Sequence, residues 1–169
     1  IMGVVWDGTG YGDDAQIWGG EFFLFQKEAI ERVGHFDYFQ WLGGDKMSKE
    51  PRLSFFSLQK DLEAAVLKEK FSAQEISVYT SLKEAKKLQT SSVGRLFDAL
   101  ASLLGICDIN SYEGEAAILL ENTVPDYEPQ HLKIYVRPGT DGIIPTHDFW
   151  DHLYRDYVNG KEKDMIILN

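Results

Sequence analysis

The sequence is poor in cysteine, in basic side chains and in long apolar runs, and each shortage excludes a class of protein. The single cysteine, Cys107, excludes an intramolecular disulfide and a zinc site built from several thiolates, and it favours a reducing, cytoplasmic setting. Lysine and arginine total 17 against 27 acidic residues, a formal charge of −10 that disfavours a nucleic-acid partner. No apolar run approaches the ~20 residues of a membrane span, so we expect no membrane partner either.

The chain nevertheless contains enough apolar material for one core, because 44% of its 169 residues are hydrophobic. Short β-branched and aromatic runs, separated by glycine-bearing turns, predict an antiparallel three-stranded meander from residues 3–6, 17–26 and 30–39. From Ser57 onward the apolar period becomes helical. We therefore expect an α+β fold, with a β-meander and glycine-rich loops over residues 1–45 and a mainly helical part over 46–169.

Individual elements are predicted most clearly in the second half of the chain. Apolar residues recur every three or four positions over residues 91–105, where a serine can cap the start of a helix and a glycine its end. A further helix should begin near Gly114, and helical spacing returns over 149–158. Residues 125–129 read as a loop and 132–136 alternate like a strand. Both chain ends resemble the interior of a fold, so we expect one partial domain, truncated at both ends.

The first segment with possible chemistry reads Asp-Gly-Thr-Gly-Tyr-Gly and follows residues 4–6, which are expected to form a buried strand. Asp7 would lie at a strand end with its carboxylate available to a cation. Gly8 and Gly10, on either side of Thr9, can bring backbone N–H groups against a phosphate. A hairpin turn uses the same residue types, and from this motif alone the hairpin is the favoured interpretation.

Two other glycine pairs interrupt the N-terminal part of the chain. Gly19 and Gly20 lie inside an expected strand, which indicates a bulge or a close backbone approach. Gly43 and Gly44, followed by Asp45, form a flexible turn that could serve a ligand, although a solvated loop is the favoured interpretation.

Two helix beginnings could also bind a ligand. Gly94 and Asp98 share a helix face that is distinct from the leucine stripe. Asp98 could hydrogen-bond a ligand or be solvated, with solvation slightly favoured. Glu113, beside Gly114, could accept hydrogen bonds from ribose hydroxyls or complete a capping box with Asn110. No arrangement of nucleophile and base can be identified, so the catalytic residues stay unassigned.

Taken in order, these segments form the series DGTGYG, WGGE, GGDK, SSVGRLFDALASLLG and SYEGEAA. The series resembles the HypF carbamoyltransferase family of hydrogenase maturation. The resemblance lies in the part built on the actin-like nucleotide-binding fold, which threonylcarbamoyl-transferring tRNA enzymes and antibiotic O-carbamoyltransferases share. It is specific over residues 4–45 and 91–121 and loose elsewhere. It implies that the meander and the helices are a piece of an actin-like ATPase-type fold.

The resemblance implies a carbamoyltransferase that binds a carbamoyl adenylate, made elsewhere in the enzyme from carbamoyl phosphate and ATP. The carbamoyl group would pass to the C-terminal cysteine of a partner protein, HypE, on the route to the cyanide ligands of nickel-iron hydrogenases. By the same resemblance, Asp7 would bind a divalent metal ion. The nucleotide and phosphate would contact Gly8, Thr9, Gly10, Gly43, Gly44, Asp45, Gly94, Asp98, Glu113 and Gly114.

The resemblance also implies parts that these residues lack. Paired metal-binding histidines would precede Ile1, a metal-binding aspartate would follow Asn169, and zinc would be bound only in upstream domains. After GGDK the family shows Pro-Trp-Arg, whereas this chain has Pro51 and Arg52 without the tryptophan. We therefore expect weak nucleotide binding at most and no complete catalysis. The alternatives are an O-carbamoyltransferase or threonylcarbamoyl-type transferase of the same fold, or a non-catalytic interaction module with an aromatic-rich surface.

Overall fold

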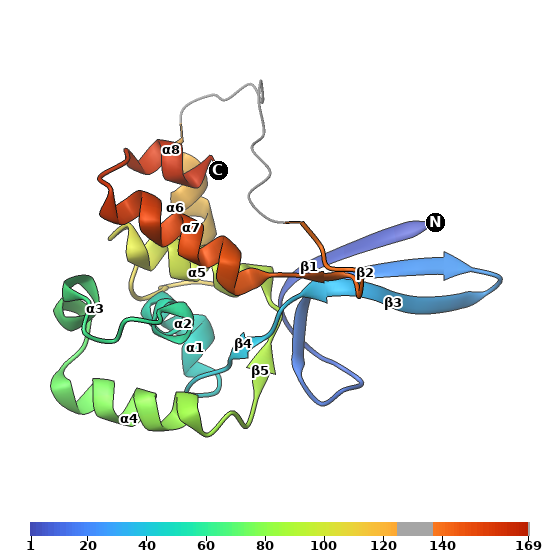
Figure 1. The fold of residues 1–169 in the computed structure, drawn as a ribbon, viewed down its shortest axis with the longest axis horizontal. Helices are drawn as coiled ribbons and strands as arrows, with labels where there is room; N and C mark the ends of the chain where they lie inside the picture. The colour runs from blue at the N-terminus through green and yellow to red at the C-terminus, as the bar shows by residue number, and fades with distance from the viewer. Residues whose placement is uncertain (125–136, 169) are drawn as a thin grey trace.

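The computed structural model describes residues 1–124 and 137–168. A β-ribbon is followed by a helical layer, which confirms the α+β prediction (Figure 1). The strands are β1 (Met2–Tyr11), β2 (Ile17–Gln26), β3 (Ala29–Phe36), β4 (Phe39–Gln40), β5 (Gln89–Thr90) and β6 (Ile143–Ile144). The helices are α1 (Lys46–Lys49), α2 (Pro51–Leu58), α3 (Ala65–Lys70), α4 (Ala73–Glu84), α5 (Val93–Leu103), α6 (Glu115–Thr123), α7 (Thr146–Val158) and α8 (Lys163–Ile167). The loop expected over 125–129 and the strand expected over 132–136 lie outside the described residues.

The predicted meander is present, because β2 pairs antiparallel with both β1 and β3. The prediction of a mainly helical part after residue 45 missed two short strands. β5 joins β2 in parallel at Thr90, and β6 joins β3 in parallel at Ile143 and Ile144. Each of these late strands is two residues long, too short for a periodic pattern to reveal in the sequence.

The N-terminal half of β1 is exposed, which contradicts the expectation of a buried strand over residues 4–6. The exposed fractions of Val4, Val5 and Trp6 are 53%, 46% and 58%. In Figure 1 this half of β1 and the β2–β3 hairpin project away from the helices, so no described layer covers them. The apolar pattern was identified correctly, but a sequence pattern cannot show which other part of a structure covers a strand.

The hydrophobic core lies among the helices and is centred on α5, which packs mainly against α2 and α6. α5 presents the predicted leucine stripe, with Leu96, Leu100 and Leu103 buried. The helical part begins at α1, at the start of the predicted range 46–169 and ahead of the helical apolar period that the sequence shows from Ser57. α2 starts at Pro51, because proline is compatible with the first position of a helix. None of the described helices is long and apolar enough to cross a bilayer.

Both ends of α5 follow the predicted capping chemistry, and α6 begins near Gly114 as predicted. The Ser92 hydroxyl accepts a hydrogen bond from Arg95 N at the start of α5, and Gly105 takes the left-handed conformation (φ 66°) just beyond its end. Gly114 is also left-handed (φ 78°) and directly precedes α6. These local signals fix where both helices begin, and both beginnings face the same region of the molecule.

Candidate functional site

The Asp-Gly-Thr segment lies within β1, at a bulge. Pairing between β1 and β2 shifts register between Trp6 and Gly10, and the residues between them have no register partners in β2. Asp7 is therefore not at the end of a strand, because β1 resumes at Gly10 and continues to Tyr11. The favoured hairpin interpretation was also wrong for these residues, because the turn to β2 comes after β1. The bulge displaces residues 7–9 from the regular ladder.

Gly19 and Gly20 permit the close backbone approach that the sequence predicted. A Cβ atom on Gly19 would lie 2.5 Å from the Asp7 carbonyl oxygen, and one on Gly20 would lie 2.3 Å from the Ser91 carbonyl oxygen. Both neighbours are backbone atoms, so they cannot move aside as a flexible side chain would. These glycines let β2 contact the bulge of β1 and the segment that leads into α5.

A buried carboxylate, Glu21, holds this junction together. Its Oε2 atom accepts hydrogen bonds from Gly19 N (2.6 Å) and Gly20 N (2.8 Å). Its Oε1 atom accepts from Arg32 Nη2 (3.1 Å) and from the Ser91 hydroxyl. The side chain is satisfied by these four donors, as a buried charge requires. Sequence reasoning did not single out Glu21, although a glutamate within an apolar strand is an available signal.

The first turn of α5 binds directly to the bulge. The Ser92 Oγ atom lies 2.6 Å from the Gly8 carbonyl oxygen and 2.9 Å from that of Asp7, close enough to donate a hydrogen bond. A Cβ atom on Gly94 would lie 3.1 Å from the Gly8 Cα atom. A glycine at this position therefore lets the helix approach the bulge closely. The first motif and the start of α5 therefore lie side by side.

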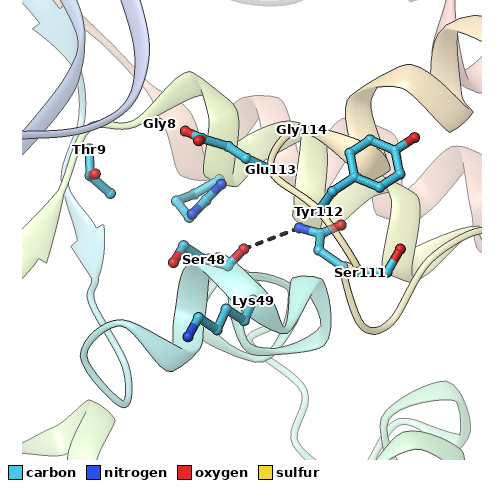
Figure 2. A pocket seen from close by; sticks show the side chains of 10 residues that line it. Gly8, Thr9, Ser48, Lys49, Ser111, Tyr112, Glu113 and Gly114 are labelled. Atoms are coloured by element: carbon cyan, nitrogen blue, oxygen red, sulfur yellow. Dashed lines mark hydrogen bonds between the residues drawn. The ribbon is translucent and has the colours of Figure 1, made fainter.

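These elements surround one cavity of about 390 Å³, a volume within the usual range for small-molecule sites. Its walls come from the β1 bulge, from α1, from the first turn of α5 and from the loop before α6. In Figure 2, Glu113 and Tyr112 extend from that loop, with Thr9 to the left and Ser48 and Lys49 below them. The lining residues are Gly8, Thr9, Ser48, Lys49, Arg95, Asn110, Ser111, Tyr112, Glu113 and Gly114.

Four of the residues selected from the sequence thus line the cavity: Gly8, Thr9, Glu113 and Gly114. The structure places two other predicted residues next to this wall. Asp7 is exposed and its Oδ1 atom accepts a hydrogen bond from Gly8 N at 2.6 Å. Gly94 packs against Gly8. The binding roles of these residues remain predictions.

Four further predicted residues lie away from the cavity wall. Gly10 is paired with Trp18 in the ladder. Gly43 and Gly44 are both left-handed and form an exposed turn, after which Asp45 precedes α1 without a side-chain cap. This turn leads into α1, whose last two residues do line the cavity. Its contribution to the site is therefore the placement of α1, and direct ligand contact by these residues remains a prediction.

Asp98 is buried, with 2% of its surface exposed, so the favoured interpretation of a solvated aspartate was wrong. It lies behind two lining residues: its Oδ2 atom is 2.7 Å from Arg95 Nε, and the Asn110 amide also interacts with it. Burial raises the pKa of Asp98 to about 6, and the nearby Arg95 charge opposes this rise. The sequence alone did not reveal this burial.

The cap of α6 uses residues other than those predicted. Asn110 accepts a hydrogen bond from Ala116 N at 3.1 Å, so it does contribute to the start of the helix. The acidic partner is Glu115, whose carboxylate accepts from both the backbone N–H and the hydroxyl of Ser111. The predicted pairing of Asn110 with Glu113 was wrong. Glu113 contributes its side chain to the cavity instead.

The structure gives limited support to a metal site in this part of the chain. Within residues 1–124 and 137–168, no three His, Cys, Asp or Glu side chains lie close enough together to hold a metal ion. Asp7 would supply one carboxylate, which is too few ligands for a divalent cation. The described residues therefore do not fit a complete metal site, and Asp7 as a metal ligand remains a prediction.

Comparison with known proteins agrees with this arrangement. The family model described as carbamoyltransferase, Kae1-like domain, second subdomain, of HypF matches residues 3–169. The chain belongs to the HypF carbamoyltransferase family. A probable carbamoyltransferase HypF of Methanocaldococcus jannaschii is 34% identical over 172 residues, which cover 95% of this chain and 22% of the relative. Carbamoyltransferase HypF2 of Cupriavidus necator is 36% identical over 133 residues, covering 76% and 16% respectively.

Solved HypF structures share the fold. A full-length HypF in its phosphate- and nucleotide-bound form superposes with a TM-score of 0.87 at 25% identity, covering 99% of this chain and 27% of that protein. HypF of T. kodakarensis superposes with a TM-score of 0.74 at 25% identity, covering 98% and 24%. The expected actin-like, Kae1-like fold is confirmed. The chain spans 16% to 27% of the HypF proteins compared here, and the family match decides against the O-carbamoyltransferase and tRNA-enzyme alternatives.

Proposed function

We propose that this chain forms one wall of the nucleotide-binding cleft of a HypF carbamoyltransferase and binds the adenylate part of carbamoyl adenylate. The observation that carries the proposal is the convergence of the β1 bulge, the first turn of α5 and the loop before α6 on one cavity. These segments are far apart in the sequence. A nucleotide-bound relative of the same fold supports the choice of ligand class.

The lining residues offer groups that suit both ends of an adenylate. Glu113 supplies a carboxylate that can accept hydrogen bonds from ribose hydroxyls. Gly8 and Thr9 lie outside the regular ladder, where a phosphate can approach their backbone. Lys49 adds a positive charge to the wall formed by α1. The cavity therefore combines groups that suit an anion with groups that suit hydroxyls.

The proposed reaction has a simple balance. An acceptor thiolate attacks the carbamoyl carbon, the bond from that carbon to the phosphate oxygen breaks, and AMP leaves with the electron pair. The described residues would hold AMP and favour its negative charge. The acceptor in this proposal is the C-terminal cysteine of HypE, and the adenylate is made from carbamoyl phosphate and ATP in other domains. A cytoplasmic setting belongs to the same proposal, supported by the free, buried Cys107.

The test is calorimetric titration of AMP and ATP into the chain and into Glu113→Ala and Asp7→Ala variants. We expect Glu113→Ala to weaken AMP binding about tenfold, because one charge-assisted hydrogen bond is lost. Glu121→Ala, an exposed glutamate on α6, is the matched control and should leave binding unchanged. AMP binding that is insensitive to both Glu113→Ala and Asp7→Ala would favour the interaction module instead.

A second measurement tests whether the chain is catalytically incomplete. Carbamoyl transfer from carbamoyl phosphate and ATP to HypE should be undetectable with these 169 residues alone. Measurable turnover would show that the adenylate-forming chemistry does not need other domains. That result would leave the nucleotide-binding proposal intact, because binding and turnover are measured separately.

A further inference from the structure

Arg95 occupies a position that is unfavourable for a cation unless a ligand compensates it. It is the third residue of α5, at the positive end of the helix dipole, where acidic residues are preferred. Only 7% of its surface is exposed, so the guanidinium is also largely removed from water. Its side chain nevertheless lines the cavity together with Gly8 and Glu113.

The guanidinium is incompletely satisfied by the protein. Asp98 Oδ2 lies 2.7 Å from Arg95 Nε, which makes an ion pair. In the part of the chain that the structure describes, however, neither Nε nor Nη1 of Arg95 has a hydrogen-bond partner of acceptable geometry. The buried Asp98 Oδ2 atom is likewise without one. An arginine offers five N–H donors, so this lining side chain keeps buried donors that the described protein atoms do not satisfy.

The charge of the surrounding wall favours an anionic ligand. Lys49 is the other cation among the lining residues, and Glu113 is the one carboxylate among them. Asp98, behind the wall, is the ion-pair partner of Arg95. The lining residues alone carry one net positive charge, and Asp98 brings the sum of the four charges to zero. The incompletely satisfied guanidinium therefore carries the preference for an anion, which a guanidinium binds through two parallel hydrogen bonds.

We propose that Arg95 binds the phosphate of the nucleotide in this cavity, while Asp98 acts as its counter-ion and positions the guanidinium from behind. The inference rests on the proposed function and deepens it by assigning phosphate recognition to a residue of α5. Asp98 then acts through Arg95, which explains why a buried aspartate lies beside the site but does not line it.

The experiment compares AMP with adenosine, because the two ligands differ only in the phosphate. Wild-type chain should bind AMP more tightly than adenosine. Arg95→Met should weaken AMP binding by roughly 10- to 100-fold, the range for a charge-assisted hydrogen bond to a charged group. Its affinity for adenosine should be unchanged. Lys68→Met, which removes an exposed lysine of α3 that does not line the cavity, should change neither affinity.

Arg95→Lys provides a second variant that keeps the positive charge, with circular dichroism confirming its fold. It should bind AMP more weakly than wild type, because lysine cannot form two parallel bonds to a phosphate. Wild-type affinity for AMP in Arg95→Met or Arg95→Lys would overturn the inference, as would equal affinity of the wild type for AMP and adenosine. If the wild type binds neither ligand, the proposed function itself fails. The two failures are therefore distinguishable.

Discussion

Glu21 should be the most important single polar side chain for the stability of the junction beneath the cavity. Four donors from Gly19, Gly20, Arg32 and Ser91 converge on its two buried oxygens. Removing one partner of a buried, hydrogen-bonded charge network costs about 3–5 kcal/mol, because the remaining groups are left without a partner. We therefore expect Glu21→Ala to lower the free energy of unfolding by about that amount, which is a large part of the ~5–15 kcal/mol of a typical domain.

Glu21→Gln tests the cause more sharply because it preserves the shape of the side chain. Its NH₂ group must face either the two glycine N–H groups or the Arg32 and Ser91 donors, so two donors lose their acceptor. The free energy of unfolding should then fall by about 2–4 kcal/mol. Each of the two donors left without an acceptor costs about 1–3 kcal/mol, and local relaxation recovers part of that cost.

Urea denaturation followed by tryptophan fluorescence measures this effect. With a slope of about 1–3 kcal/mol per molar urea, such a loss moves the midpoint by roughly a molar unit or more. The control is Glu31→Gln, an exposed glutamate on β3, which should stay within about 0.5 kcal/mol of wild type. Equal losses in Glu21→Gln and Glu31→Gln would refute the assignment of Glu21 as the anchor of the junction.

Two further predictions concern the same region. Gly20→Ala should lower the free energy of unfolding, measured by urea denaturation, by about 1–3 kcal/mol, because its Cβ would lie 2.3 Å from Ser91 O. Gly3→Ala is the control, since a Cβ there meets no atom within 4 Å. Equal denaturation midpoints for the two variants would contradict the close approach. Burial raises the pKa of Asp98 to about 6, against 3.8 when unperturbed, so between these values the folded state binds more protons and the stability contributed by this group falls as pH rises. Between about pH 4 and pH 6 the free energy of unfolding of the wild type should therefore fall by up to about 3 kcal/mol more than that of Asp98→Asn. Parallel curves of unfolding free energy against pH for the two proteins would exclude this effect.

The ionisable surroundings of Asp98 bear on the last of these predictions. Arg95 and the Asn110 amide act on its carboxyl directly. Asp98, Asp108 and Glu115 all act on the nearby Cys107 thiol, whose pKa burial raises. Asp108 has its own partner in Lys70, on α3. These neighbours are present in both wild type and Asp98→Asn, so their contributions to the pH dependence of stability cancel to first order when the two proteins are compared.

Local signals in the sequence predicted the helices better than they predicted the site. The limits of α5 followed from a serine cap, a repeating apolar stripe and a terminal glycine, all of which act over a few residues. The meander followed from strand-like runs and turns. The close approach at Gly19 and Gly20 was also predicted, because a glycine pair inside a strand needs such a reason.

What the sequence could not show depends on contacts between distant segments. Ser48, Lys49 and Arg95 line the cavity because α1 and α5 meet the bulge and the loop before α6, and no local pattern distinguishes these side chains from solvated ones. The burial of Asp98 has the same origin. The exposure of Trp6 could not be predicted either, because an apolar strand has the same sequence pattern whether or not another layer covers it.

The contrast between Glu21 and Arg95 supports the location of the site. Both are buried charges within the same junction, yet Glu21 is satisfied by four protein donors. Arg95, although paired with Asp98, keeps two nitrogens without a hydrogen-bond partner in the described part of the chain. Arg32 Nε is also buried without a hydrogen-bond partner in the described residues, but Arg32 does not line the cavity. At Arg95 a ligand could supply the missing acceptors, and unmet buried groups otherwise destabilise the fold. An incompletely satisfied cation at a cavity wall, beside a carboxylate whose two oxygens are both satisfied, is the arrangement expected where a ligand supplies the missing acceptors.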